Sequence, residues 1–221
     1  IRLSNNMAEI LVVSGEINAI RDGFESVIFP ADKVNLEVIK PIRRIQKINY
    51  YTSWKESNSY WIDDNGLIEK EISSYPKATK EDLLIWKLRQ GIPSINREIN
   101  GDTNPYELGL GDTINLDKGC YLGQEAIARL FRNKSLKYQL RYWEAYGKSN
   151  DLDIGKKLLD TNQDEGLKKK VGAITSSVRV DEKSFKGLAL IKVKFADKEF
   201  CFSENGDSIN IKKPISFMQP Y

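Results

Sequence analysis

The sequence has no histidine and only two cysteines among its 221 residues. The lack of histidine excludes Ser–His and Cys–His nucleophile pairs, imidazole ligands for catalytic zinc, and the commonest general base. Cys120 and Cys201 lie far apart and form no Cys-x-x-Cys pattern, so neither a zinc ribbon nor a self-contained iron–sulfur site is expected. We therefore predict no metal site built by this chain alone.

Long apolar runs and a strong excess of one charge are also missing. No apolar stretch approaches the ~20 residues of a membrane helix, and no signal-peptide pattern opens the chain. Lysine and arginine number 34 against 31 aspartates and glutamates, and the two signs are interspersed. This pattern predicts no membrane contact and no direct nucleic-acid partner, and it favours the cytoplasm or an organelle matrix or stroma.

The chain begins with isoleucine in sequence that already looks structured, so we expect that it is a fragment. Its first part predicts a strand over 7–14, a helix over 17–29 and a strand over 34–39. Residues 43–50 predict a further strand, with a helix as the alternative because isoleucine recurs at 42, 45 and 48. Strand, helix and strand in this order indicate an α+β arrangement of the ferredoxin-like kind.

Two aromatic clusters, Tyr50-Tyr51-Thr52-Ser53-Trp54 and Tyr60-Trp61-Ile62, come next. They favour core residues on hairpin strands, with a stacking platform for a planar ligand as the alternative. A helix over 79–90 follows, capped by Thr79 with Asp82. Its apolar stripe consists of Leu84, Ile85 and Leu88, with Leu83 and Trp86 at the edge. After it, residues 92–112 form a long loop, which in a compact domain is usually functional.

Residues 118–129 carry the most unusual chemistry. Gly119 and Gly123 allow the backbone to turn or to approach a ligand closely. A strand is expected over 113–116, and a helix is expected from Gln124 to Phe131. A loop that leads into a helix N-terminus favours an anionic or strongly accepting ligand group.

Cys120 lies between Lys118 and this helix start, where its thiolate form is favoured, so it is a candidate reactive thiol. A buried structural cysteine is the alternative. Gln124 and Glu125 offer an amide and a carboxylate that could pair with a heterocycle edge.

From residue 136 the chain changes to short, evenly spaced strands, which predict a small antiparallel β-barrel. They fall at 140–143, 170–175, 177–180, 187–195, 199–203 and 208–211. We therefore expect two domains, an α+β region over 1–135 and a barrel over 136–221.

The run Lys-Gly-Cys-Tyr-x-Gly-Gln-Glu with Ala128-Arg129 resembles the signature of the YgfZ-type folate-binding proteins, relatives of the glycine-cleavage T-protein. Flanking segments are similar as well, roughly from residue 85 to 195. They are Leu88-Arg89-Gln90-Gly91-Ile92-Pro93, Asn104-Pro105-Tyr106-Glu107-Leu108-Gly109-Leu110, Val171-Gly172-Ala173-Ile174-Thr175-Ser176-Ser177 and Gly187-Leu188-Ala189-Leu190.

The resemblance implies ferredoxin-like folate-binding domains of the T-protein type, followed by the barrel, with the N-terminal segment of the family missing. It implies a protein that binds tetrahydrofolate, or a one-carbon-substituted form, and supports iron–sulfur cluster assembly or maintenance and tRNA modification. Its partners would then be folate and iron–sulfur enzymes or assembly proteins. One alternative is an enzyme, a folate-dependent aminomethyltransferase like the T-protein. The other is a non-catalytic member with only a structural role.

The resemblance assigns different residues to the two ends of folate, the glutamate tail and the pterin ring. Lys118, Arg89 and Arg129 would face the anionic glutamate tail, Glu98 or Glu125 would accept from the pterin, and Tyr121 would stack on the ring. Gly119, Gly123 and Gln124 complete the expected folate-binding set, and Cys120 is the candidate for chemistry. Arg89 also suits a surface arginine, and Glu107 fits the family pattern as well as Glu98.

Overall fold

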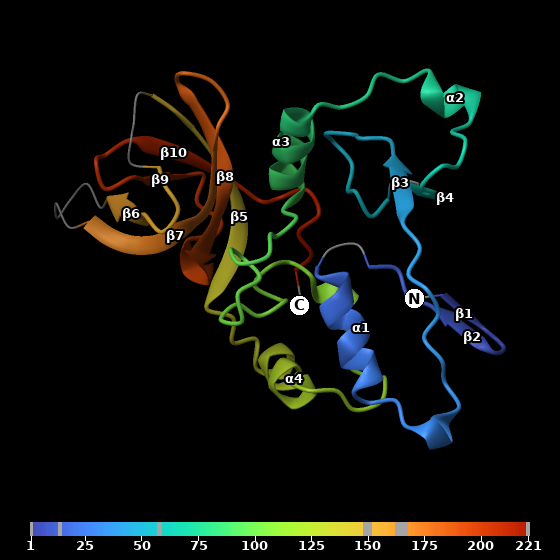
Figure 1. Ribbon diagram of the computed structural model, residues 1–221. Helices are drawn as coiled ribbons and strands as arrows, with labels where there is room; N and C mark the ends of the chain where they lie inside the picture. The colour runs from blue at the N-terminus through green and yellow to red at the C-terminus, as the bar shows by residue number, and fades with distance from the viewer. Residues whose placement is uncertain (1, 13–14, 57–58, 148–151, 162–167, 220–221) are drawn as a thin grey trace. The chain divides into compact units, whose positions relative to one another are not determined.

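The computed structural model describes residues 2–12, 15–56, 59–147, 152–161 and 168–219 (Figure 1). They fall into two compact units, residues 1–43 with 61–66, and residues 44–60 with 67–221. The chain is α+β, and its largest element is a closed barrel of six antiparallel strands. The α+β class and the barrel are thus confirmed, whereas the ferredoxin-like arrangement and the domain boundary at residue 136 stay predictions.

The first unit contains a hairpin of β1 (Arg2–Ser4) and β2 (Met7–Glu9), helix α1 (Ile17–Glu25) and the 3₁₀ turn η1 (Pro30–Asp32). The strand expected over 7–14 is confirmed only over β2, and residues 13–14 lie outside the described part. The helix expected over 17–29 is confirmed, but it ends at Glu25. A second two-stranded sheet pairs β3 (Ile42–Gln46) with β4 (Ser59–Asp63).

The strand predicted over 34–39 is wrong, because the backbone there has no strand pairing. The Arg21 guanidinium donates to the carbonyl oxygens of Leu36 at 3.4 Å and Glu37 at 3.2 Å. These carbonyls are therefore satisfied by a side chain rather than by a neighbouring strand.

The second unit opens with the loop that carries Tyr50, Tyr51 and Trp54. Tyr51 is 87% exposed, so the core interpretation is wrong for this residue. Trp54 is half-buried, with the Arg44 guanidinium 5.6 Å from its ring centroid. A short helix, α2 (Lys70–Ser73), lies between this loop and the next helix.

Helix α3 (Lys80–Gln90) begins where the capping pattern predicts. The Thr79 hydroxyl accepts from the Asp82 N–H at 3.0 Å, and the Asp82 carboxylate accepts from the Thr79 N–H at 3.0 Å. The predicted apolar stripe is only partly right, since Leu88 is buried but Leu84 is 40% exposed. Trp86, expected at the edge of the stripe, is buried, and its indole N–H donates to the Asn49 carbonyl at 3.0 Å.

The barrel strands are β5 (Tyr138–Tyr146), β6 (Lys157–Thr161), β7 (Lys168–Arg179), β8 (Ser184–Lys192), β9 (Phe200–Phe202) and β10 (Ser208–Lys212), with the 3₁₀ turn η3 (Val193–Phe195) after β8. Their order around the barrel is β10-β5-β8-β7-β6-β9. The strands expected over 170–175 and 177–180 are one strand, β7, with an irregular register between Ile174 and Ser176. Strand β6 was not predicted.

Alternation along β5 and β8 separates two cores. Trp143, Ala189 and Ile191 belong to one cluster with the buried residues of β6, β7, β9 and β10. Leu140, Tyr142 and Leu188 belong to a second cluster with Leu88 of α3, Leu108 and Phe217. Helix α3 and the loop after it therefore cover the outer face of β5 and β8 (Figure 1).

Candidate functional site

The segment that leads into the signature is turned rather than extended. The 3₁₀ turn η2 (Gly111–Thr113) is followed by Asn115, whose side-chain oxygen accepts from the N–H groups of Asp117 at 2.8 Å and Lys118 at 3.1 Å. The strand predicted over 113–116 is therefore wrong, because this asparagine offers the backbone a local partner in place of a strand ladder.

Helix α4 (Gln124–Asn133) begins at the residue that the sequence predicts. Gly123 precedes it with φ +85°, a left-handed conformation that glycine adopts without steric cost. This glycine lets the chain turn sharply from the signature loop into the helix.

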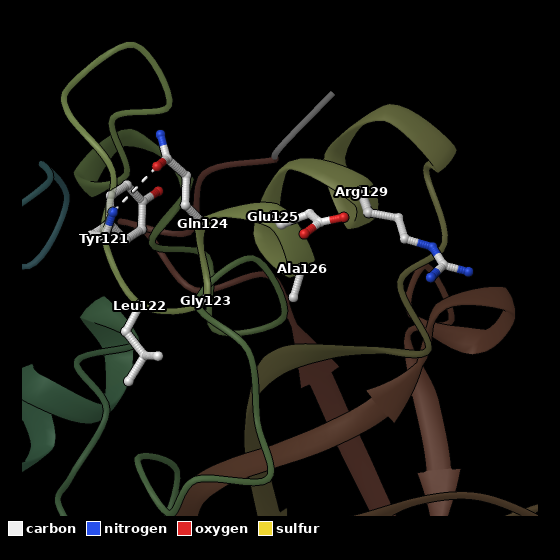
Figure 2. Close-up of a pocket in the computed structure, with 7 residues that line it drawn as sticks. All are labelled: Tyr121, Leu122, Gly123, Gln124, Glu125, Ala126 and Arg129. Carbon is white, nitrogen blue, oxygen red and sulfur yellow. Dashed lines mark hydrogen bonds between the residues drawn. The ribbon is translucent and has the colours of Figure 1, made fainter.

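The Gln124 side chain is engaged inside the loop. Its amide nitrogen donates to the carbonyl oxygens of Leu116 at 2.9 Å and Lys118 at 3.3 Å. Its oxygen accepts from the Tyr121 N–H at 3.3 Å, as Figure 2 shows. The carboxamide thus joins both ends of the turn that contains Cys120.

An open pocket lies at the N-terminus of α4 (Figure 2). It is lined by Tyr121, Leu122, Gly123, Gln124, Glu125, Ala126 and Arg129. Five of these, Tyr121, Gly123, Gln124, Glu125 and Arg129, are residues that the sequence predicts for folate. The Lys118 ammonium lies 4.7 Å from the centroid of the Tyr121 ring, so a further predicted cation stands beside the pocket.

Tyr121 connects this loop to the body of the second unit. Its hydroxyl oxygen is buried and has no hydrogen-bond partner among the described residues. Burial and the nearby Tyr121 raise the pKa of Tyr106, whose ring lies 5.8 Å from that of Phe131 in α4. Tyr106 thus lies against Phe131 of α4 and near the Tyr121 side chain of the loop.

Arg89 and Glu98 are not among the residues that line this pocket. The Arg89 guanidinium lies 5.5 Å from the centroid of the Tyr50 ring. Glu98 is fully buried, and its carboxylate accepts from the Ser176 hydroxyl at 2.6 Å and from the Ser94 N–H at 2.9 Å. Their contacts to folate stay predictions.

Glu107, the alternative to Glu98, is also engaged by the fold. Its carboxylate accepts from the Tyr138 N–H at 3.1 Å and the Lys137 N–H at 3.3 Å, at the start of β5. Glu98 therefore joins the loop over 92–112 to β7, and Glu107 joins the same loop to the start of β5.

The two cysteines have opposite environments. Cys120 is exposed within the signature loop, as a reactive thiol requires, and its reactivity stays a prediction. Cys201 is 2% exposed on β9, and burial raises the pKa of its thiol to about 12. Within the described ranges, no three cysteine or carboxylate side chains come together as metal ligands would.

Leu122 and Ala126 line the pocket but were not predicted. Ala126 lies three residues before Arg129 in α4, a spacing that places both on the same helix face. Helical periodicity alone could therefore have identified Ala126. Leu122 is fully exposed, and no periodicity or charge pattern identifies it beyond its place within the signature.

The fold and site define an α+β chain whose six-stranded barrel adjoins a glycine-turned loop and an open pocket at a helix N-terminus. No family model matches the chain. A stretch of 54 residues is 44% identical to an Arabidopsis thaliana protein named "Putative transferase At1g60990, chloroplastic". The match covers 24% of this chain and 12% of that relative. No helix in the described part of the chain is both long and apolar enough to span a bilayer.

Proposed function

We propose that this chain binds tetrahydrofolate, or a one-carbon-substituted form, in the pocket at the N-terminus of α4. The observation that carries the proposal is the convergence of Tyr121, Gly123, Gln124, Glu125 and Arg129 on this one pocket. These are residues that the resemblance to the YgfZ-type proteins assigns to folate, and they were named from sequence alone.

The chemistry of the pocket suits the ligand. A folate carries a pterin with N–H donors at one end and carboxylates at the other. Glu125 offers an acceptor for the donors, and Arg129 offers a charge-assisted donor for a carboxylate. Lys118 beside the Tyr121 ring adds a second cation, and the ring adds a flat apolar wall.

The wider role that we propose is support of iron–sulfur cluster assembly or maintenance and of tRNA modification, within the T-protein type of fold. The resemblance of the signature supports it, because the cysteine-bearing form of the motif belongs to the YgfZ-like branch. The chloroplastic name of the Arabidopsis relative is compatible with an organelle stroma as the compartment.

A transferase is the second candidate, and one observation favours it, namely the name of that relative. The reaction would move the methylene of a lipoyl-bound aminomethyl group to tetrahydrofolate, with release of ammonia and of the dihydrolipoyl group as a thiol. The two candidates share the folate pocket and differ in turnover. Supplying an aminomethyl-lipoyl protein with tetrahydrofolate should give methylene-tetrahydrofolate with a transferase and no product with a non-catalytic folate binder.

Calorimetry with tetrahydrofolate under anaerobic conditions tests the shared pocket. We expect saturable binding by the chain, and an affinity loss of about tenfold or more in Lys118→Ala and Glu125→Ala, because each removes a charged partner. Matched controls are Lys183→Ala and Glu182→Ala, which remove the same charges from exposed positions in the turn between β7 and β8. Equal affinity in all four variants, or no binding by the unaltered chain, contradicts the proposal.

A further inference from the structure

One side chain closes the signature loop. The Gln124 carboxamide has two N–H donors and an oxygen, and all three groups are used within the protein. The donors reach the carbonyls of Leu116 and Lys118, and the oxygen reaches the N–H of Tyr121. Gln124 therefore has no donor left for a ligand, although it stands at the pocket wall.

These bonds hold the part of the loop that carries the chemistry. They attach the backbone of Lys118 and of Tyr121 to the first residue of α4. The side chains of the same two residues contact each other, with the Lys118 ammonium 4.7 Å from the Tyr121 ring centroid. Fixing the two backbone points thus fixes a cation and a ring at the edge of the pocket.

We propose that Gln124 is a positioning residue, which sets the places of Lys118 and Tyr121 and donates no hydrogen bond to the ligand. This inference rests on the proposed function for the identity of the ligand, but the loop geometry itself does not. It also replaces the expectation that Gln124 pairs with a heterocycle edge, since its donors are already engaged.

The substitution Gln124→Glu separates shape from hydrogen bonding. It keeps the size of the side chain, removes both donors, and places a carboxylate against two carbonyl oxygens, which repel it. Gln124→Ala removes the bonds without that repulsion. Asn133→Asp is the matched control, since it makes the same amide-to-carboxylate change at the exposed last residue of α4.

The first measurement is amide hydrogen exchange in the absence of ligand. We expect both Gln124 variants to exchange the Tyr121 amide about tenfold faster than the unaltered chain. Gln124→Ala removes its hydrogen-bond acceptor, and in Gln124→Glu the carbonyl oxygens of Leu116 and Lys118 repel the carboxylate and displace it from the Tyr121 N–H. The amides of β5 should be unchanged, because the barrel strands do not depend on this side chain. Asn133→Asp should leave the Tyr121 amide unchanged.

The second measurement is the dissociation constant for tetrahydrofolate together with the melting temperature. We expect affinity to fall about tenfold in Gln124→Glu while the melting temperature stays the same, a result that general destabilisation does not give. Unchanged exchange at Tyr121 in both variants overturns the inference, and so does faster exchange with unchanged affinity. If the unaltered chain binds no tetrahydrofolate, the proposed function fails, and the exchange result alone decides whether Gln124 positions the loop.

Discussion

The Glu98 carboxylate accepts a 2.6 Å hydrogen bond from the Ser176 hydroxyl, which lies 78 residues further along the chain. Glu98 is fully buried and Ser176 is 1% exposed on β7. A carboxyl acceptor in a buried site makes a strong hydrogen bond, and its loss leaves the hydroxyl unpaired. This contact therefore holds the loop over 92–112 against the barrel.

The first prediction concerns this pair. Glu98→Ala should lower the free energy of unfolding by about 2–4 kcal/mol, and Ser176→Ala by about 1–3 kcal/mol, because each leaves a buried polar group without its partner. Urea denaturation of both single variants and the double variant measures their coupling. Strictly additive losses would show that the contact does not contribute to stability.

The second prediction concerns Gly187 on β8. A Cβ at this position would overlap the Ser176 carbonyl oxygen, and it would lie 2.6 Å from atoms of the Trp143 ring. Gly187→Ala should therefore destabilise the chain by at least about 3 kcal/mol, because strand backbone and a buried indole must both move.

Gly119→Ala is the control for this substitution, since a Cβ there meets nothing within 4 Å. Its effect should stay within about 0.5 kcal/mol. Denaturant midpoints measure both variants, and similar midpoints would contradict the close approach of β8 to Trp143.

The third prediction concerns acid stability through Glu144 on β5. Burial raises the pKa of this carboxyl group, but hydrogen bonds from Lys212 and Tyr142 and the charge of Lys186 together lower it below its ordinary value of 4.5. A lowered pKa in the folded state means that Glu144 stabilises the protein at neutral pH. This contribution is lost as the pH falls through the folded-state pKa, below about 4.5.

Glu144→Gln should thus cost about 1–2 kcal/mol at pH 7 and flatten the loss of stability below pH 5. Stability measured by urea at several pH values checks this. Glu182→Gln, an exposed site in the turn after β7, should keep the original pH dependence. An unchanged acid slope in Glu144→Gln would refute the assigned role.

The fourth prediction concerns the two thiols. Only Cys120 should react with iodoacetamide in the folded chain, because Cys201 is 2% exposed and burial raises its thiol pKa to about 12. Mass spectrometry should show one added group in buffer and two in denaturant. Two groups added at equal rates in buffer would contradict the burial of Cys201.

Local patterns predicted the local parts of this structure. Thr79 with Asp82 marked the start of α3, and Gly123 marked the start of α4, because capping and left-handed turns depend on neighbours in sequence. The pocket residues could be predicted for the same reason, since one loop and the first turns of α4 supply them all.

Distant contacts account for the failures. The strand expected over 34–39 is absent where the Arg21 side chain takes two carbonyls. The contact of Glu98 with Ser176 was not predicted, because it depends on how the loop meets β7, which sequence spacing does not reveal. The strands predicted over 170–175 and 177–180 are likewise one strand, β7, whose register with β8 is irregular after Ile174.

The most direct test of the central claim is to map tetrahydrofolate on the chain by amide chemical shifts in a labelled sample under anaerobic conditions. Binding at the N-terminus of α4 predicts saturable shifts that concentrate at residues 118–129, with the amides of β7 and β9 serving as internal controls. Saturable shifts concentrated elsewhere, or no saturable shifts at all, would contradict the assignment of this pocket to folate.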